Sequence, residues 1–250
     1  KELGNKKAKV LNNSFYYTDL LTETSLENCI YILKDTMKLD EQYYILGGGL
    51  IQIIDKIKKK LKSKIMFETI LENYNYNKTE KYFEITINNV GKQSVLKTKN
   101  LILAIDKQNL LKLPPLAPIQ SKLNSVNNIL LIRVYAIYPK NKDGKVWFDK
   151  MPKIYTDSLL KYIIPINYNT GLIMISYVDF KHAEKIKKYT LDGSLKNVIQ
   201  KECHKLFPDK HIPEPIYLNS HIWDNGVALW KKGINFKKIN KELIKPFNYP

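Results

Sequence analysis

Residues 43–62 read YYILGGGLIQIIDKIKKKLK, and this stretch decides how the fold of the chain is interpreted. It begins with a short apolar run at 43–46, as expected of a strand, and three glycines follow at once. Apolar residues then recur at the spacing of one face of an amphipathic helix: Leu50, Ile51, Ile54, Ile57 and Leu61. The other face carries lysines, which is typical of a solvated surface. The stretch therefore predicts a strand, a glycine turn and a helix.

The residues around this stretch extend the pattern. Ser25 has the side chain of a helix N-cap, and apolar residues at helical spacing follow it to about Lys38. Residues 64–68 predict a second strand, and a strand–helix–strand unit normally makes a right-handed crossover between parallel strands. An antiparallel meander is predicted next, at 70–76, 82–87 and 94–98. Residues 101–105 are a continuous apolar run, typical of a buried central strand.

A proline cluster, Pro114, Pro115 and Pro118, then opens a second region. Strands are predicted there at 129–138, 145–148, 162–166, 172–177 and 216–223. Two helices are predicted between them, at 181–189 and 194–207. The fold class expected is therefore mixed α/β, with a meander inserted into the first region and a sheet with helices in the second.

The composition limits the function classes. The net charge of the 250 residues is +17, but Arg133 is the only arginine, and nucleic-acid readers usually exploit the bidentate arginine fork. We expect no specific nucleic acid as a partner, and at most weak, salt-sensitive binding of polyanions. No apolar run approaches the roughly 20 residues that span a bilayer, and the first residues are polar. The sequence therefore predicts a soluble, intracellular protein without a membrane partner; its oligomeric state is not indicated.

The cysteines and histidines show no metal-ligand spacing. Cys29 and Cys203 are far apart and no CxxC is present, so both are expected to be buried thiols, and no metal site is predicted. Cys203 and His204 are adjacent, but neighbours on a helix point about 100° apart. We expect no shared chemistry between them.

The triple glycine has two meanings by itself. Gly47, Gly48 and Gly49 can let a phosphate approach the backbone at a helix N-terminus, or they can simply permit a tight turn. They match neither GxGxxG nor the phosphate loop that ends in GK[ST]. On their own they favour the turn.

Four features in the same order give these glycines a context. YYILGGGLIQIIDKIKKKL is followed by the meander, by the apolar strand of NLILAIDKQNLLKL, and by PPLAP at 114–118. In this order and spacing, the segment 43–118 resembles the middle of the flavin-dependent amine oxidases, the monoamine and polyamine oxidase family. ILLIRVYAIYP at 129–139 resembles the first long strand of that family's substrate domain, and HIWDNGVALWKKG at 221–233 resembles the segment that returns the chain to the flavin.

The resemblance implies a cofactor and a set of site residues. The cofactor is FAD, and the residues set against it are Gly47, Gly48, Gly49, Leu50 and Ala104. Lys112 matches a lysine that lies beside the flavin ring in the family, and it becomes the catalytic candidate. Burial there would lower the pKa of this lysine and suit it to proton transfer. Residues 225–230 lack the tyrosine of the family's substrate cage, so either Trp230 takes its place as the substrate-binding residue or the cage is missing.

The resemblance also implies a domain organisation. Residues 1–40 are expected to be a helical segment of the substrate domain, and 41–112 a Rossmann-like portion of the FAD-binding domain. Residues 113–224 are expected to form the substrate-binding domain, and 225–250 to return toward the FAD domain. Neither the GxGxxG fingerprint nor the Gly-Glu-containing flavin motif of the family is in the sequence, so we expect an interior portion of such a protein.

Three function classes follow from the sequence. The first is an FAD-dependent oxidoreductase that takes a hydride from a C–N or similar bond of a small molecule such as an amine, with reoxidation by oxygen. The second is a catalytically inactive structural or interaction module of the same fold. The third is a lysine-rich polyanion binder, whose affinity would fall steeply with salt.

Overall fold

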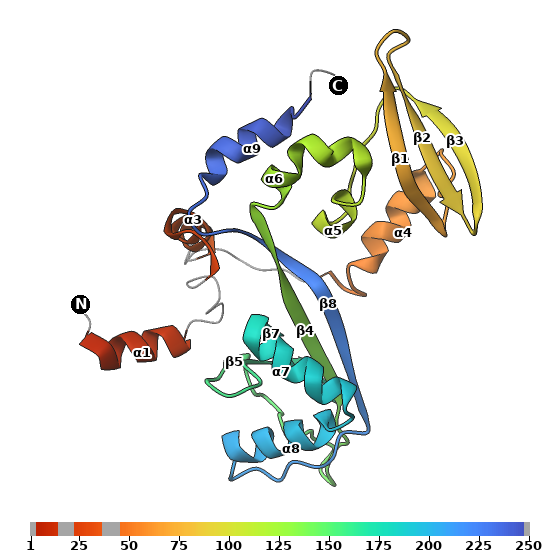
Figure 1. Cartoon of the computed structure of the whole chain (residues 1–250). Coiled ribbons are helices and arrows are strands. Elements are labelled where there is room, and N and C mark those ends of the chain that lie inside the picture. The colour runs from red at the N-terminus through yellow and green to blue at the C-terminus, as the bar shows by residue number, and fades with distance from the viewer. Residues whose placement is uncertain (1–3, 15–22, 37–45, 248–250) are drawn as a thin grey trace. The chain divides into compact units, whose positions relative to one another are not determined.

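The computed structural model describes residues 4–14, 23–36 and 46–247 (Figure 1). Their contacts divide the chain into two compact units. Unit 1 comprises the described residues up to Cys29 together with Ser125–Ile234. Unit 2 comprises the described residues of Ile30–Asn124 and those from Asn235 onward. Helices accompany one antiparallel sheet in each unit, which confirms the mixed α/β class.

Unit 2 contains the predicted meander. Its strands are β1 (Thr69–Asn77), β2 (Tyr82–Asn89) and β3 (Lys92–Thr98), paired antiparallel in the order β1-β2-β3. The turn between β2 and β3 forms because the side-chain oxygen of Asn88 accepts a hydrogen bond from the backbone N–H of Gly91, at 2.8 Å. Gly91 has a φ of +83°, which glycine adopts without strain.

The helices of unit 2 are α4 (Ile51–Lys60), α5 (Lys107–Leu110), the 3-10 helix η1 (Pro114–Ile119), α6 (Gln120–Leu123) and α9 (Phe236–Ile244). This unit has a small apolar core, to which α4 contributes no residue. The buried core residues are Tyr74, Phe83, Leu113, Leu116 and Ile119. The sequence did not predict α9; Asn235 caps it, and Glu242 on it pairs with Lys122 at 3.1 Å. The helix α3 (Leu26–Thr36) begins at Ser25 as predicted, because the backbone N–H of Asn28 donates to the Ser25 hydroxyl.

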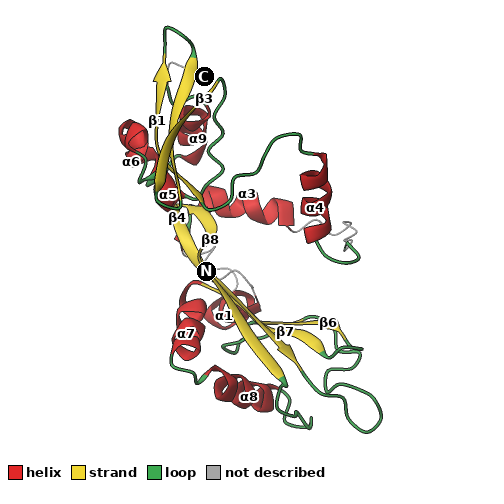
Figure 2. Cartoon of the chain, turned by 90° about the vertical axis from the view of Figure 1, so that its right-hand side faces the viewer, coloured by secondary structure: helices red, strands yellow, loops and turns green. Residues whose placement is uncertain are grey.

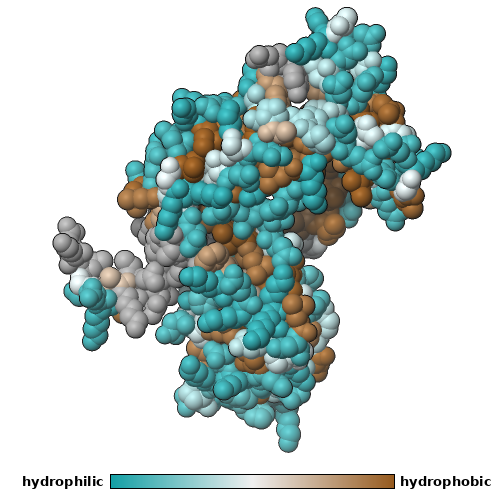
Figure 3. Space-filling model, viewed as in Figure 1, coloured by the Kyte–Doolittle hydropathy of each residue, from teal (hydrophilic) through white to brown (hydrophobic). Residues whose placement is uncertain are grey.

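The predicted parallel crossover is wrong for the described residues. Residues 43–45 lie outside them, Leu46 and residues 64–67 form no strand, and residues 101–105 run as an irregular segment. An apolar run becomes a central strand only where strands pair with it on both sides, and no described strand pairs with these segments. The helix α4 is present, but its apolar residues are exposed, and apolar atoms lie among hydrophilic ones in that part of Figure 3.

Unit 1 is built on a five-stranded antiparallel sheet in the order β5-β6-β7-β4-β8. Its strands are β4 (Val126–Ile137), β5 (Ile154–Tyr155), β6 (Tyr162–Asn167), β7 (Leu172–Asp179) and β8 (Tyr217–Trp230). β4 is hydrogen-bonded to β7 on one side and to β8 on the other, and β4 and β8 run along each other in Figure 1. β8 is longer than the predicted segment 216–223.

Helices cover one face of this sheet. α7 (Phe180–Leu191) and α8 (Leu195–Leu206) lie beside the strands in Figure 2, and α1 (Gly4–Ser14) also belongs to this unit. Ile132, Val134 and Ala136, at alternate positions of β4, are fully buried against Ala183 and Ile186 of α7. The intervening positions of β4 therefore face the other side of the sheet.

Two further sequence expectations are settled in unit 1. Residues 145–148 form no strand: Lys145 and Val146 are irregular and Trp147 and Phe148 begin a turn, although Val146 and Phe148 are buried in the core. Both cysteines are free and buried, as predicted; Cys203 lies in the core while His204 is exposed. Burial raises the pKa of the Cys203 thiol to about 12, so this thiol stays protonated at neutral pH.

Two kinds of feature are absent from the part of the chain that the structure describes. None of its helices is long and apolar enough to cross a membrane. No group of three or more metal-ligating side chains is found there either.

The turn between β6 and β7 offers a test of this packing. Gly171 has a φ of +74° and its carbonyl accepts a hydrogen bond from the N–H of Tyr138; a Cβ atom there would lie 2.2 Å from the Tyr138 oxygen. Gly193 has a similar φ of +77°, but nothing lies within 4 Å of its Cβ position. We expect Gly171→Ala to lower the free energy of unfolding by about 2 kcal/mol more than Gly193→Ala, measured by urea denaturation. Equal effects of the two substitutions would contradict the close approach.

Candidate functional site

The glycine turn is an exposed turn at the start of α4. Gly48 and Gly49 have φ values of +82° and +83°, and the N–H of Gly49 donates to the carbonyl of Leu46 at 2.9 Å. The side chain of Gln52 folds back over the turn, and its Nε2 donates to the carbonyl of Gly47 at 2.8 Å. A Cβ atom at Gly48 would overlap this amide, which is the end of a flexible side chain, so the turn requires glycine there for its positive φ.

The structure places Ala104 and Lys112 on either side of α5. Asp106 caps this helix by accepting hydrogen bonds from the N–H groups of Gln108 and Asn109. Ala104 is exposed, and Lys112 is exposed and donates to the side-chain oxygen of Asn109 at 3.2 Å. The expected burial of Lys112 is therefore not found among the described residues.

These residues do not form a flavin site on their own. Gly47, Gly48, Gly49, Leu50, Ala104 and Lys112 are all exposed. The space beside Gly48 is taken by the Gln52 side chain, and in the described chain no hydrogen bond or ion pair joins the glycine turn to Ala104 or Lys112. An FAD molecule would need further residues to enclose it.

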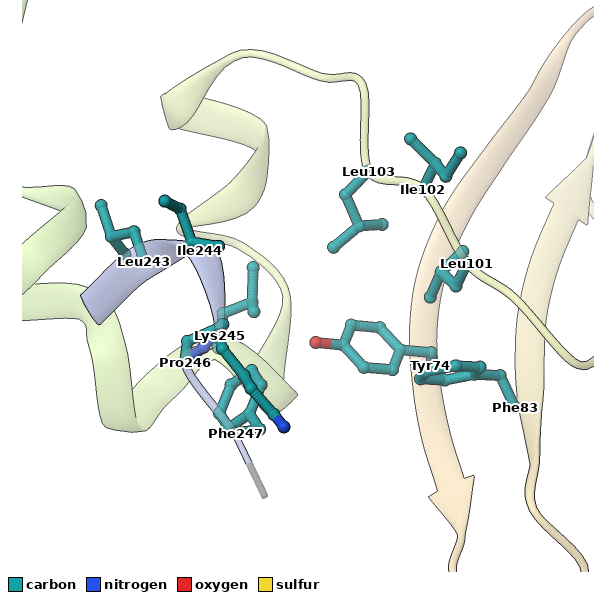
Figure 4. A pocket seen from close by; sticks show the side chains of 11 residues that line it. Tyr74, Phe83, Leu101, Ile102, Leu103, Leu243, Ile244, Lys245, Pro246 and Phe247 are labelled. Atoms are coloured by element: carbon teal, nitrogen blue, oxygen red, sulfur yellow. The ribbon is translucent and has the colours of Figure 1, made fainter. Parts of the chain in front are cut away.

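A groove of about 720 Å³ opens elsewhere in unit 2 (Figure 4). Its lining is mostly apolar: Tyr74, Phe83, residues 101–103, Leu116 and residues 243–247. Figure 4 shows the Tyr74 ring reaching into it with its hydroxyl directed toward the C-terminal residues. Leu101 and Leu103 pack against the unit 2 core, whereas Ile102 is 87% exposed. The run that the sequence predicts as a central strand thus forms one wall of this groove.

Unit 1 carries a row of aromatic rings that crosses its sheet in strand order. Tyr155 on β5 lies 4.2 Å from Tyr162 on β6, and Tyr162 lies 5.4 Å from Tyr177 on β7, between ring centroids. Arg133 on β4 lies over the Tyr177 ring at 4.8 Å and over the Trp223 ring of β8 at 5.7 Å. We call these five residues the aromatic row. It lies on the face opposite α7, because Arg133 alternates with the buried Ile132 and Val134.

Strand pairing fixes the position of Arg133. It is directly opposite Tyr177 on β7 and directly opposite His221 on β8. Side chains opposite each other in an antiparallel pair lie on the same face. His221 in turn stacks on Trp223 at 5.9 Å and meets Tyr135 edge-on at 5.6 Å. The guanidinium is therefore framed by rings on both sides.

Arg133 has no acidic partner among the described residues. None of the ion pairs among the described residues includes Arg133. The Nε atom of Arg133 is shielded from solvent and has no hydrogen-bond partner. Burial by itself would lower the pKa of Arg133, but hydrogen bonds with the hydroxyls of Tyr177 and Tyr135 raise it, so the side chain stays charged. An unpaired buried donor costs about 1–3 kcal/mol. The sheet thus holds a cation that lacks a counter-ion.

Further positive charge surrounds the row. The ammonium of Lys153 lies over the rings of Tyr155 and Tyr162, at 5.0 and 4.9 Å from their centroids. The sequences of β4, β5 and β6 contain no acidic residue, and Asp179, the last residue of β7, pairs with Leu131 two positions from Arg133. Asp224 of β8 is occupied by Lys187 on α7, at 2.6 Å.

Trp230, the predicted substrate residue, lies at the far end of β8. It pairs with Val126, and its carbonyl accepts a hydrogen bond from the hydroxyl of Thr24. Arg133 follows Val126 by seven positions on β4, which corresponds to about 23 Å along the strand. Core packing would bury the Trp223 side chain, but it is 42% exposed and belongs to the aromatic row. The sequence contained one signal for the row: the only arginine alternates with apolar residues on a strand.

The comparisons with known proteins show what the fold is. No protein-family model and no curated protein matches the sequence. A structure from Exiguobacterium sp. 255-15, provisionally named a protoporphyrinogen oxidase, is 13% identical and matches with a TM-score of 0.63, over 86% of this chain and 48% of that one. A putrescine oxidase variant from a redesign of cofactor binding is 15% identical, with a TM-score of 0.57 over 74% of this chain and 42% of that one.

These matches confirm the expected fold. Both structures have the flavin amine-oxidase fold, and at such identities the likeness shows the fold alone. The chain spans about half the length of each structure.

A titration tests the packing beneath Lys161. His182 on α7 is half-buried, and this burial, together with the charges of Lys161 and Lys185, lowers its pKa to about 4. The unfolded chain binds this proton already near the ordinary pKa of about 6.5, so stability is lost as the pH falls from about 6.5 to 4. We expect His182→Gln to reduce this loss by on the order of 1 kcal/mol in urea denaturation, after allowance for the partly exposed ring.

The matched control is His204→Gln, at an exposed position of α8. It should leave the pH dependence of the free energy of unfolding as it is in the unaltered chain. If His182→Gln and His204→Gln give the same profile between pH 6.5 and 4, the account of His182 is wrong.

Proposed function

We propose that this chain is part of an FAD-dependent oxidoreductase of the amine-oxidase type. Its reaction would be removal of a hydride from a C–N or similar bond of a small molecule, with reoxidation by oxygen. The observation that carries the proposal is the fold, which matches a flavin-oxidase structure with a TM-score of 0.63 over 86% of the chain. A bound flavin would supply the hydride acceptor, and the protein would position the substrate and exclude water.

The two units would contribute different parts of such an enzyme. In unit 2, the glycine turn and Lys112 would be the residues set against the flavin, and the five-stranded sheet of unit 1 would belong to the substrate domain. The described residues do not enclose a flavin, and the chain spans about half the length of the matching structures. Residues other than those described would therefore also take part in binding the cofactor.

A catalytically inactive module of the same fold is the second candidate. The observation that favours it is the exposure of Lys112 and of the glycine turn, with Gln52 folded into the space beside Gly48. In that case the sheet and helices would persist as an interaction scaffold, and no cofactor would be bound.

Flavin content separates the two candidates. The longest open reading frame that contains these residues is expressed and purified, and its visible absorbance and its flavin released on denaturation are measured. We expect about one flavin per chain and bleaching of the visible bands when substrate is added without oxygen. The 250-residue chain by itself should retain none. A colourless long product with no released flavin would refute the enzyme proposal.

A pair of glycine variants tests the assigned cofactor contact in the long product. Gly48→Ala should lower its flavin content several-fold, because it strains the turn that would lie against the cofactor. Gly91→Ala has the same conformational strain, with a φ of +83°, but open space around its Cβ position in the meander turn. It should leave the flavin content unchanged. Equal flavin content in both variants would remove Gly48 from the cofactor site.

A further inference from the structure

The aromatic row offers flat surfaces that reach solvent. Tyr155 and Trp223 are 43% and 42% exposed, and they lie on the two outer strands, β5 and β8. The rings between them are already spaced for stacking and edge contacts, at 4.2 and 5.4 Å between centroids. Tyr162 in the middle of the row is buried, so a planar, largely apolar ligand would contact ring surface at Trp223 and at the partly buried Tyr177, beside Arg133.

The charge of the row selects among such ligands. Arg133 is held in place by the rings and by strand pairing, it carries a full charge, and it lacks a carboxylate among the described residues. Lys153 adds a second positive charge over the rings of Tyr155 and Tyr162. An anionic group would be attracted to this face, and a protonated amine would be repelled from it.

The chemistry of the Arg133 side chain also indicates which kind of anion would bind. A guanidinium presents its donors in a planar fork that matches the two oxygens of a carboxylate, and it is less strongly hydrated than an ammonium. Its Nε is buried without a partner and its outer nitrogens hydrogen-bond with the hydroxyls of Tyr177 and Tyr135, so a ligand would use the remaining outer N–H groups. A carboxylate bound there would lie against ring faces in a partly dry environment, where a charged hydrogen bond is strengthened.

We propose that the aromatic row binds a planar, aromatic carboxylate through Arg133, so that the substrate of the proposed oxidoreductase is an anion rather than a simple alkyl amine. This deepens the proposed function by naming the substrate class. Arg133 is the specificity-determining residue, and Tyr177 and Trp223 position it. Binding itself needs no flavin, since every residue involved belongs to unit 1.

The experiment is a calorimetric titration of the 250-residue chain with three probes of one shape. They are naphthoate, naphthylmethylamine and naphthalenemethanol, which carry a negative, a positive and no charge on the same ring system. At physiological salt we expect naphthoate to bind at least about ten-fold more tightly than either of the others. Arg133→Met should remove this preference, and Arg133→Lys should keep only part of it, because lysine lacks the planar fork.

A control variant separates a specific site from general lysine charge. Lys97→Met removes another cation held over a ring, that of Tyr82 at 4.5 Å, and Lys97 lies in unit 2. It should leave the naphthoate affinity unchanged. Circular dichroism melting verifies that each variant is folded; if Arg133→Met is not, Arg133→Lys and Trp223→Leu decide, and both should weaken naphthoate more than naphthalenemethanol.

Several results would overturn the proposal. These are undetectable naphthoate binding at millimolar concentration, equal affinity for naphthoate and naphthylmethylamine, and equal effects of Arg133→Met and Lys97→Met. The last result would mean that the chain is a non-specific polyanion binder. The assay contains no flavin, so a flavin-free long product refutes the oxidoreductase and leaves this binding site standing. A flavin-containing product without the anion preference refutes this inference alone.

Discussion

The pairing of β4 on both sides is the constraint on which unit 1 depends. β7 and β8 both hydrogen-bond to it, and each pairing contains one register shift, between Val134 and Tyr135 on the β7 side and between Ile129 and Leu131 on the β8 side. Between these irregularities the pairing is regular on both sides, and Arg133 lies there. Because side chains alternate across a strand, this one register sends Ile132 and Val134 into the core and Arg133 to the opposite face. The core and the aromatic row are thus two results of a single alignment.

The sequence predicted the elements that depend on local chemistry. The meander needs only alternating side chains and the Asn88–Gly91 turn, and the helices need only spacing and a cap such as Ser25. The conformation of residues 101–105 could not be predicted in this way, because an apolar run does not specify which strands will pair with it. The predicted strand is an irregular segment in the structure. Without a pairing strand among the described residues, Leu101 and Leu103 pack against Tyr74 and Phe83, while Ile102 remains exposed. The same applies to residues 145–148, where Val146 and Phe148 enter the core without a strand.

The candidate site shows the same division. Consecutive glycines predict a tight turn, and Gly48 and Gly49 adopt the positive φ that such a turn uses. The residue spacing does not reveal that the Gln52 side chain folds back to the carbonyl of Gly47, five residues before it. Lys112 was identified by its place in a motif, and its exposure depends on how α5 packs. The row combines residues from five strands whose order in the sheet differs from their order in the sequence. Only that order places Tyr177 and Trp223 around Arg133.

The composition of the chain makes Arg133 more informative than an arginine in an average protein. It is one arginine among 41 basic residues, so the bias of this sequence strongly favours lysine at any position that needs only positive charge. A lysine between Tyr177 and Trp223 would have to give up a tightly bound hydration shell, and its point charge could not stack on either ring. A guanidinium loses less on desolvation, stays charged beneath the rings and keeps a planar edge for a ligand. The position therefore suits a planar cation better than an ammonium, as the proposed recognition of a carboxylate in contact with flat rings demands.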